Sequence, residues 1–232
     1  MGSIFQDHVK RYPNLYYVPQ DTPTLEAMMW GETWEEFSKT EPMPIHLSHQ
    51  VFRENRTRYF IDPAAWFEFL SGCEFAFGIT RIHGNITALL AGTPAYIFVH
   101  DSRTLELARY FEIPHTILAD VPDNVDVNDL LAKADYSKML SGHKARFDNY
   151  IAFVEKNGLD HVFKPNNGGG VFDTMIADTK FPPAVEVAGR DDRNDIVNRL
   201  RYVRNTHARR MHKIEDHAKD LAAKVDKLGK AG

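Results

Sequence analysis

Short apolar runs alternate with helical patterns through the middle of this 232-residue chain, and this alternation constrains the fold more than any other feature. Strand-like runs and helical segments follow one another in the order 74–79, 86–90, 95–99, 105–111, 116–118 and 127–134. Such spacing is typical of βαβ units, in which helices join parallel strands. The sequence therefore predicts an α/β fold with a parallel sheet flanked by helices.

Shorter elements are expected on either side of this region. We expect strands over 15–18 and 58–61, and a helix over 64–70 that begins with Asp62 as its N-cap and Pro63 in its first turn. Further helices are expected over 4–11, 24–30, 34–38 and 136–158. The helix over 64–70 carries an apolar face that is suited to packing on a sheet.

Polar side chains follow two of the expected strands. Arg81 and His83 come directly after the first strand and open the next helical segment, and residues 100–104 follow the second strand. In an open α/β sheet, ligands bind at the carboxyl ends of strands, and a helix start adds free amide N–H groups and partial positive charge. Arginine binds phosphate or carboxylate groups, and histidine can pass a proton near neutral pH. The pattern favours an anionic substrate and a proton transfer.

A structural interpretation of the same residues stays open at this point. Arg81 and His83 could form a pair that only satisfies loop carbonyls. Two neighbouring features favour the functional interpretation: Gly84 permits close approach of the backbone, and a second polar cluster follows the next strand. Together they suggest one site built from two loops.

Six segments between residues 62 and 115 carry a recognisable set of motifs. They are Asp62-Pro63-Ala64-Ala65-Trp66, Phe75-Ala76-Phe77-Gly78, Arg81-Ile82-His83-Gly84-Asn85, Leu90-Ala91-Gly92-Thr93-Pro94, His100-Asp101-Ser102-Arg103-Thr104 and Ile113-Pro114-His115. With these motifs, the stretch from Trp66 to His115 resembles the polysaccharide pyruvyl transferase family. The resemblance implies a Rossmann-like domain, half of a GT-B-like fold whose two halves face a cleft.

The resemblance also implies a reaction. Members of the family move a pyruvyl group from phosphoenolpyruvate onto two hydroxyls of a sugar, which makes a cyclic ketal. His83 would protonate the methylene carbon of phosphoenolpyruvate as a general acid, or orient the substrate, and Arg81 would hold its phosphate or carboxylate. The residues expected to bind substrate are Arg81, Ile82, Gly84, Asn85, Asp101 and Arg103. The scheme requires no metal and no other cofactor.

Several alternatives remain at the level of function. Asp101 either orients His83 or an acceptor hydroxyl, or it caps the following helix, while Arg103 adds positive potential. Only about 65 residues precede the matched stretch, fewer than the N-terminal half of a usual member would need. The chain could therefore be a sugar-nucleotide-dependent glycosyltransferase half, or a non-catalytic binding or assembly subunit with a helical tail. The expected partners are phosphoenolpyruvate and a sugar or glycan acceptor, and no nucleic acid.

The single cysteine, two histidines and the N-terminal residues bear on metal binding and on the cellular compartment. Cys73 is the single cysteine and lies in an apolar segment, so we expect a buried thiol and a reducing compartment. His46 and His49 have a spacing compatible with metal binding, although we favour a solvated or core pair. The first residues lack the features of a secretory signal, and no apolar run approaches the length of a membrane span. We therefore expect a cytoplasmic protein.

The C-terminal part of the chain differs from the rest in charge. Residues 190–232 carry a net charge of +5 and the remainder −9, within a total of −4. We expect a loop-like linker over 164–189, whose triple glycine lacks the Lys-Ser/Thr of a phosphate-binding loop, and one long amphipathic helix over 191–228. This helix could self-associate, pack on the body or lie on a membrane surface. The predicted domains are 1–163, the linker 164–189 and the basic helical tail 190–232.

Overall fold

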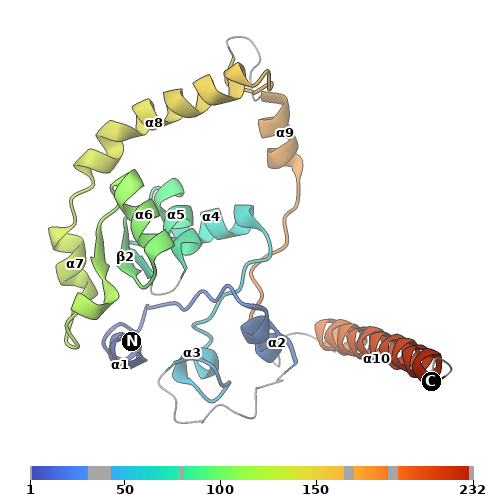
Figure 1. The fold of residues 1–232 in the computed structure, drawn as a ribbon. Helices are drawn as coiled ribbons and strands as arrows, with labels where there is room; N and C mark the ends of the chain where they lie inside the picture. Colours follow the sequence, from blue (N-terminus) through green and yellow to red (C-terminus); the bar gives the residue numbers. More distant parts are fainter. Residues whose placement is uncertain (1, 31–42, 79–80, 165–169, 188–192, 230–232) are drawn as a thin grey trace. The chain divides into compact units, whose positions relative to one another are not determined.

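A computed structural model describes residues 2–30, 43–78, 81–164, 170–187 and 193–229 (Figure 1), with side chains described for residues 200–225 of the last helix. The chain divides into two compact units. The first unit consists of Met1–Gln20 with Arg58–Ala184, and the second of Asp21–Thr57 with Val185–Gly232. Among the described residues, no helix combines the length and the apolar character needed to cross a bilayer.

A three-stranded parallel sheet forms the centre of the first unit. Its strands are β1 (Ala76–Gly78), β2 (Ala95–Val99) and β3 (His115–Ile117), in the order β1-β2-β3. Helix α5 (Ile82–Leu90) connects β1 with β2, and helix α6 (Ser102–Phe111) connects β2 with β3. The predicted α/β class and the parallel sheet flanked by helices are therefore confirmed.

The hydrophobic core lies around β2, which is the middle strand. All of its residues except Tyr96 are buried, as expected for a strand covered on both faces. One cluster joins β2 to α5, α6 and the segment between α6 and β3, and it consists of Ile82, Ile97, Val99, Ala108 and Ile113. A second cluster joins helix α4 (Pro63–Ser71) to α5 and β2 through Leu70, Ala88 and Ala95, with Trp66 and Phe69 packed against it. Figure 1 shows α4, α5 and α6 beside β2.

Aspartate caps fix the starts of three helices in this unit. The side chain of Asp62 accepts a hydrogen bond from the Ala64 N–H at the start of α4, where Pro63 occupies the first turn as predicted. Asp101 caps α6, and Asp126 caps helix α7 (Val127–Lys133). Each carboxylate satisfies an amide N–H group that the helix itself leaves without a partner.

The remaining helices of the first unit lie toward its chain ends. They are α1 (Gly2–Arg11), α8 (Ser137–Lys156) and α9 (Gly170–Asp178), and a single 3-10 turn covers Leu118–Asp120. The long helix expected over 136–158 is therefore confirmed as α8. Helix α9 corrects the predicted loop over 164–189. Its apolar residues recur one and four positions apart, a helical pattern that the flanking glycines and prolines had outweighed in the sequence.

Two predicted strands do not form. Residues 15–18 and 58–61 make an isolated contact instead, in which the Arg58 N–H donates to the Tyr17 carbonyl oxygen at 3.0 Å. Pro19 directly follows the first run, Pro63 follows the second after Asp62, and a proline removes a ladder donor. The runs are therefore too short to extend the pairing into a sheet.

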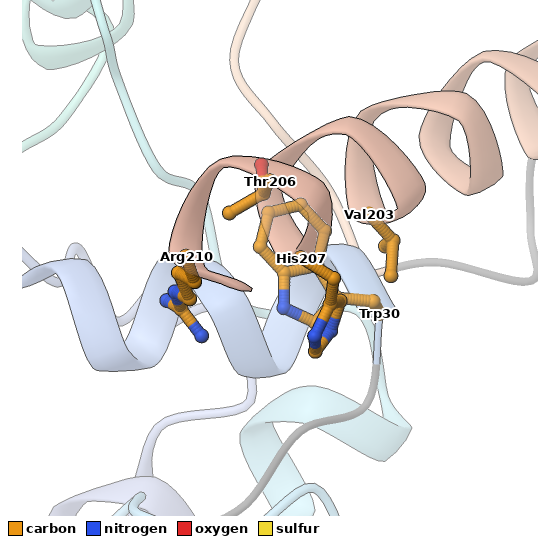
Figure 2. Close-up of a pocket in the computed structure, with 5 residues that line it drawn as sticks. All are labelled: Trp30, Val203, Thr206, His207 and Arg210. Carbon is orange, nitrogen blue, oxygen red and sulfur yellow. The ribbon is translucent and has the colours of Figure 1, made fainter. Parts of the chain in front are cut away.

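The second unit is helical. Its described helices are α2 (Thr22–Trp30), α3 (Gln50–Arg53) and α10 (Arg193–Gly229), and the last of these confirms the long C-terminal helix. The Trp30 ring stacks on Tyr202 with a centroid distance of 5.0 Å, and Arg210 forms an ion pair with Glu26 at 2.8 Å. Figure 2 shows Trp30 against one side of α10, where it lines a small pocket with Val203, Thr206, His207 and Arg210.

Residues 21–57 thus share a compact unit with α10, a pairing that the sequence did not indicate. The domain boundaries 1–163, 164–189 and 190–232 stay a prediction. The helix expected over 34–38 and the glycines at 168–169 lie outside the described residues.

Candidate functional site

The candidate site is built at the carboxyl edge of the parallel sheet. Strand β1 ends at Gly78, and α5 begins at Ile82 with Arg81 as its N-cap residue. Strands β1 and β2 are parallel, and Gly78 of β1 is paired with Ile97 of β2. The segments that follow the two strands therefore leave from the same edge of the sheet. Residues 81–85 and 100–104 therefore follow adjacent strand ends, as the sequence predicts. Residues 79 and 80, which also belong to the motif, lie outside the described part of the chain.

The start of α5 differs chemically from that of α6. Arg81 has extended backbone angles (φ −135°, ψ 118°), and its side chain makes no capping hydrogen bond to this helix. The first-turn N–H groups of Ile82, His83 and Gly84 have no acceptor inside the helix, as at any helix start. These groups and the helix dipole favour a negatively charged ligand. The side chains of Arg81 and His83 are exposed at the same helix start.

Asn85 fixes α5 against the end of β1. Its side chain is only 2 % exposed, and a Cβ built on Gly78 would collide with its Nδ2 atom and lie 2.9 Å from its Cγ. The missing side chain at Gly78 therefore makes room for the amide of Asn85. Among the described residues, Nδ2 of Asn85 has no hydrogen-bond acceptor. A buried polar group without a partner is uncommon in folded proteins, so this amide is a candidate donor to a bound group.

Gly84 brings a second set of side chains against the first turn of α5. A Cβ at Gly84 would lie 2.8 Å from Nε2 of Gln20 and 3.5 Å from Cζ2 of Trp66. Trp66 stacks on Phe60 with a centroid distance of 6.1 Å, and its buried indole N–H has no acceptor among the described residues. The side chains of Gln20 and Trp66 therefore occupy the space that the absence of a Cβ at Gly84 leaves. No sequence motif indicated that Gln20 belongs to this site, whereas Trp66 ends the motif over residues 62–66.

Ile82 and His83 face different environments. The Ile82 side chain is 7 % exposed and belongs to the core around β2, so any ligand contact at this residue would come from its backbone. His83 is exposed, and its carbonyl oxygen accepts a hydrogen bond from the Thr87 hydroxyl at 2.8 Å. The local fold thus buries Ile82 as an anchor and leaves the adjacent imidazole accessible.

Asp101 is the N-cap of α6. Its Oδ1 accepts a hydrogen bond from the Thr104 N–H at 2.6 Å, and its Oδ2 lies 3.1 Å from Nε2 of His100. The Thr104 amide, with smaller contributions from the Thr104 hydroxyl, His100 and Arg103, holds the pKa of the Asp101 carboxyl below its usual range. The capping alternative is therefore observed. A role of Asp101 or of the exposed Arg103 toward His83 or an acceptor stays a prediction.

The other candidate ligands have local roles. Nδ1 of His46 lies 2.7 Å from the Ser48 hydroxyl, and Nδ1 of His49 accepts from the Val51 N–H at the start of α3. Cys73 is half-buried, and burial raises the pKa of its thiol. Among the residues that the structure describes, no group of three or more histidine, cysteine or acidic side chains is gathered as a metal site would require.

Comparison with known families bears on these residues directly. Residues 12–102 match the family described as polysaccharide pyruvyl transferase, a range that contains Arg81, His83 and Asn85 and ends one residue before Arg103. No curated protein matches the chain, and no solved structure does. The family is one of transferases that act on polysaccharides. Over residues 12–102, which include the start of α5, this chain thus matches the polysaccharide pyruvyl transferase family, and the match confirms the resemblance found in its motifs.

Proposed function

We propose that the chain binds phosphoenolpyruvate at the start of α5 and takes part in pyruvyl transfer to two hydroxyls of a sugar or glycan acceptor. The observation that carries the proposal is the family match over residues 12–102, because this range contains the start of α5, where the N-cap residue Arg81 makes no capping hydrogen bond and Arg81 and His83 are exposed. Phosphoenolpyruvate carries a phosphate and a carboxylate, and both groups need cationic and N–H donors at fixed positions. The donor and the ketal product are parts of this proposal.

Each residue at the helix start has a distinct role in the proposed reaction. The guanidinium of Arg81 holds the phosphate or the carboxylate, and the N–H groups of His83 and Gly84 donate to the same anion. His83 gives a proton to the methylene carbon, which becomes the methyl group of the ketal. Asn85, whose Nδ2 has no acceptor among the described residues, provides a further donor beside the end of β1.

The atoms of the proposed reaction balance without an added reactant. One acceptor hydroxyl attacks C2 as the methylene carbon is protonated, and this hydroxyl gives up its proton. The bond between C2 and the phosphate oxygen then breaks, and the second hydroxyl attacks C2 to close the ketal. Of the two hydroxyl protons, one is taken up as the methyl proton and the other leaves with the phosphate. The products are a pyruvyl ketal and inorganic phosphate.

Binding can be tested apart from turnover. We expect calorimetric titration with phosphoenolpyruvate to show a loss of about 1.5–3 kcal/mol in the Arg81→Ala variant, since a charge-assisted hydrogen bond is removed. Arg109→Ala is a matched control, because Arg109 is exposed in the last turn of α6 and away from the strand ends. Unchanged affinity in Arg81→Ala, or an equal loss in both variants, contradicts the assigned site.

The role of His83 is tested by phosphate release in the presence of phosphoenolpyruvate and candidate acceptors. The His83→Gln variant should keep most of its affinity for phosphoenolpyruvate and lose turnover by roughly 10²–10⁴-fold, the usual contribution of a general acid. Near-normal turnover in this variant refutes the proton-donor role. Binding without any phosphate release in the wild-type chain supports the non-catalytic binding subunit instead. We place the reaction in the cytoplasm, where an unpaired cysteine such as Cys73 stays reduced.

A further inference from the structure

An apolar stripe runs along the distal half of α10. Met211, Ile214, Leu221 and Val225 are 55 %, 61 %, 49 % and 66 % exposed. Such a row of aliphatic side chains, on a helix whose other faces are charged, indicates a surface that is covered in the working protein.

The spacing of the stripe is that of a coiled coil. Met211, Ala218 and Val225 are seven residues apart and take the first core position of a heptad, called a. Ile214 and Leu221 take the second core position, called d, which lies three residues further on. The described contacts between helix α2 and α10, which are the stack of Trp30 on Tyr202, the ion pair of Glu26 with Arg210 and the pocket in Figure 2, lie on the N-terminal side of this stripe.

We propose that residues 211–225 of α10 pair with the same residues of a second copy of this chain, as a parallel two-stranded coiled coil in register. A second copy fits the stripe because the a and d side chains repeat at one spacing, so two copies present matching surfaces. The proposed number of strands rests on the last two core layers. Val225 at a with Leu221 at d is the combination that favours two strands, whereas Met211, Ala218 and Ile214 do not specify that number.

The flanking charges decide the direction of pairing. In a parallel pair, each residue at the g position lies beside the e residue five positions further along the partner. Arg210 at g, which forms an ion pair with Glu26 of its own chain, then lies beside Glu215 at e, His217 lies beside Ala222, and no like charges come together. In an antiparallel pair, g positions face g positions, and Lys224 lies beside His217 at both ends. The parallel pair therefore avoids the repulsion between basic side chains that the antiparallel pair carries.

Residues around position 207 do not extend the apolar core. Arg204 and His207 occupy the preceding a and d positions, and His207 lines the pocket against Trp30. Polar groups at core positions weaken a coiled coil while fixing its register. The proposed pairing therefore begins at Met211, beyond the part of α10 that α2 contacts. This inference is independent of the proposed chemistry at α5.

Disulfide formation between single cysteines tests the direction of pairing in the full chain. In a Cys73→Ser background, Val225→Cys and Ile214→Cys should each form a covalent dimer of identical chains under mild oxidation. A mixture of the two variants, one of them carrying a size tag, should give no mixed dimer. Lys213→Cys, at the outer c position, is the matched control and should remain uncrosslinked. Mixed dimers of the 214 and 225 variants overturn the parallel arrangement.

Light scattering over a concentration series tests the second copy itself. The wild-type chain should have twice the monomer mass, and the Ile214→Lys, Leu221→Lys double variant should shift the equilibrium toward monomer by more than about 100-fold, because both d layers lose their apolar contacts. Lys219→Ala, on the polar face, should leave the mass unchanged. A monomeric wild type, a trimer or tetramer, or a double variant that keeps the dimer overturns the proposal.

Discussion

At the residue scale, a glycine and an asparagine hold the first turn of α5 in place. Gly78 has no Cβ, and the space this leaves is filled by the amide of the buried Asn85. The arrangement determines where Arg81 and His83 stand relative to the end of β1, because all of these residues belong to one strand–helix connection. Gly78 and the buried Asn85 therefore position the exposed Arg81 and His83.

We expect Gly78→Ala to destabilise the chain by about 1–3 kcal/mol, the usual cost of overpacking a buried site. Urea denaturation of the variant beside the wild type measures this cost. Gly72→Ala is the matched control, because a Cβ there would lie 3.6 Å from the Phe69 carbonyl oxygen, an ordinary contact. Adding Asn85→Ala to Gly78→Ala should recover part of the loss. An equal effect of both alanine substitutions contradicts the fit between Gly78 and Asn85.

At the scale of elements, a polar network ties α1 to the start of α7. His8 is buried, and its Nε2 accepts a hydrogen bond from the Val127 N–H at 3.2 Å, while its Nδ1 lies 2.7 Å from the Ile4 carbonyl oxygen. The Asp126 carboxylate accepts hydrogen bonds from the Tyr12 hydroxyl, the Asn128 N–H and Arg11. The N-terminal helix is therefore anchored by hydrogen bonds as well as by its apolar face.

The Asp126 carboxylate should make stability depend on pH. The Tyr12 hydroxyl, followed by the Asn128 amide and Arg11, holds the pKa of Asp126 below its usual range. The unfolded chain then binds more protons near the ordinary aspartate pKa of about 3.9, so the stabilisation is present above that pH and is lost as pH falls through the folded-state pKa. Urea denaturation from about pH 3 to pH 7 should show a flatter pH profile for Asp126→Asn. A slope in Asp126→Asn equal to that of the wild type contradicts the assignment.

At the scale of the whole molecule, the chain forms two compact units from interleaved segments. The segment Asp21–Thr57 leaves the first unit and joins Val185–Gly232 in the second. Within that second unit, the described contacts between α2 and α10 include the stack of Trp30 on Tyr202 and the ion pair of Arg210 with Glu26. Segments far apart in the sequence are thus joined within this unit by side-chain contacts.

We expect Trp30→Ala to loosen the first half of α10. An aromatic pair contributes about 0.5–1.5 kcal/mol beyond its burial, so amides near residues 202–210 should exchange several-fold faster with solvent deuterium. The amides of β2 serve as an internal control, because this strand belongs to the first unit. Unchanged exchange along α10, or faster exchange in β2 to the same degree, contradicts the role given to Trp30.

The sequence by itself determined the parallel sheet, the long C-terminal helix and the position of Arg81 and His83 after a strand. These features depend on local patterns, since apolar periodicity and capping residues act over a few neighbouring positions. The helix over 170–178 also has a local apolar periodicity, but the glycines and prolines around it led to the prediction of a loop. The short runs at 15–18 and 58–61 failed as strands because forming a sheet needs partners that no local pattern supplies.

Tertiary structure alone decided the surroundings of the candidate site. The burial of Asn85 against Gly78 and the approach of Gln20 and Trp66 to Gly84 join residues up to 64 positions apart. Contacts of this kind depend on how the chain crosses itself, and no periodicity in one segment records them. The same holds for Trp30 and Tyr202, which are separated by most of the chain and meet only because α10 packs on α2. The motif around Arg81 and His83 is therefore recognisable from local sequence, whereas its surroundings depend on packing between distant segments.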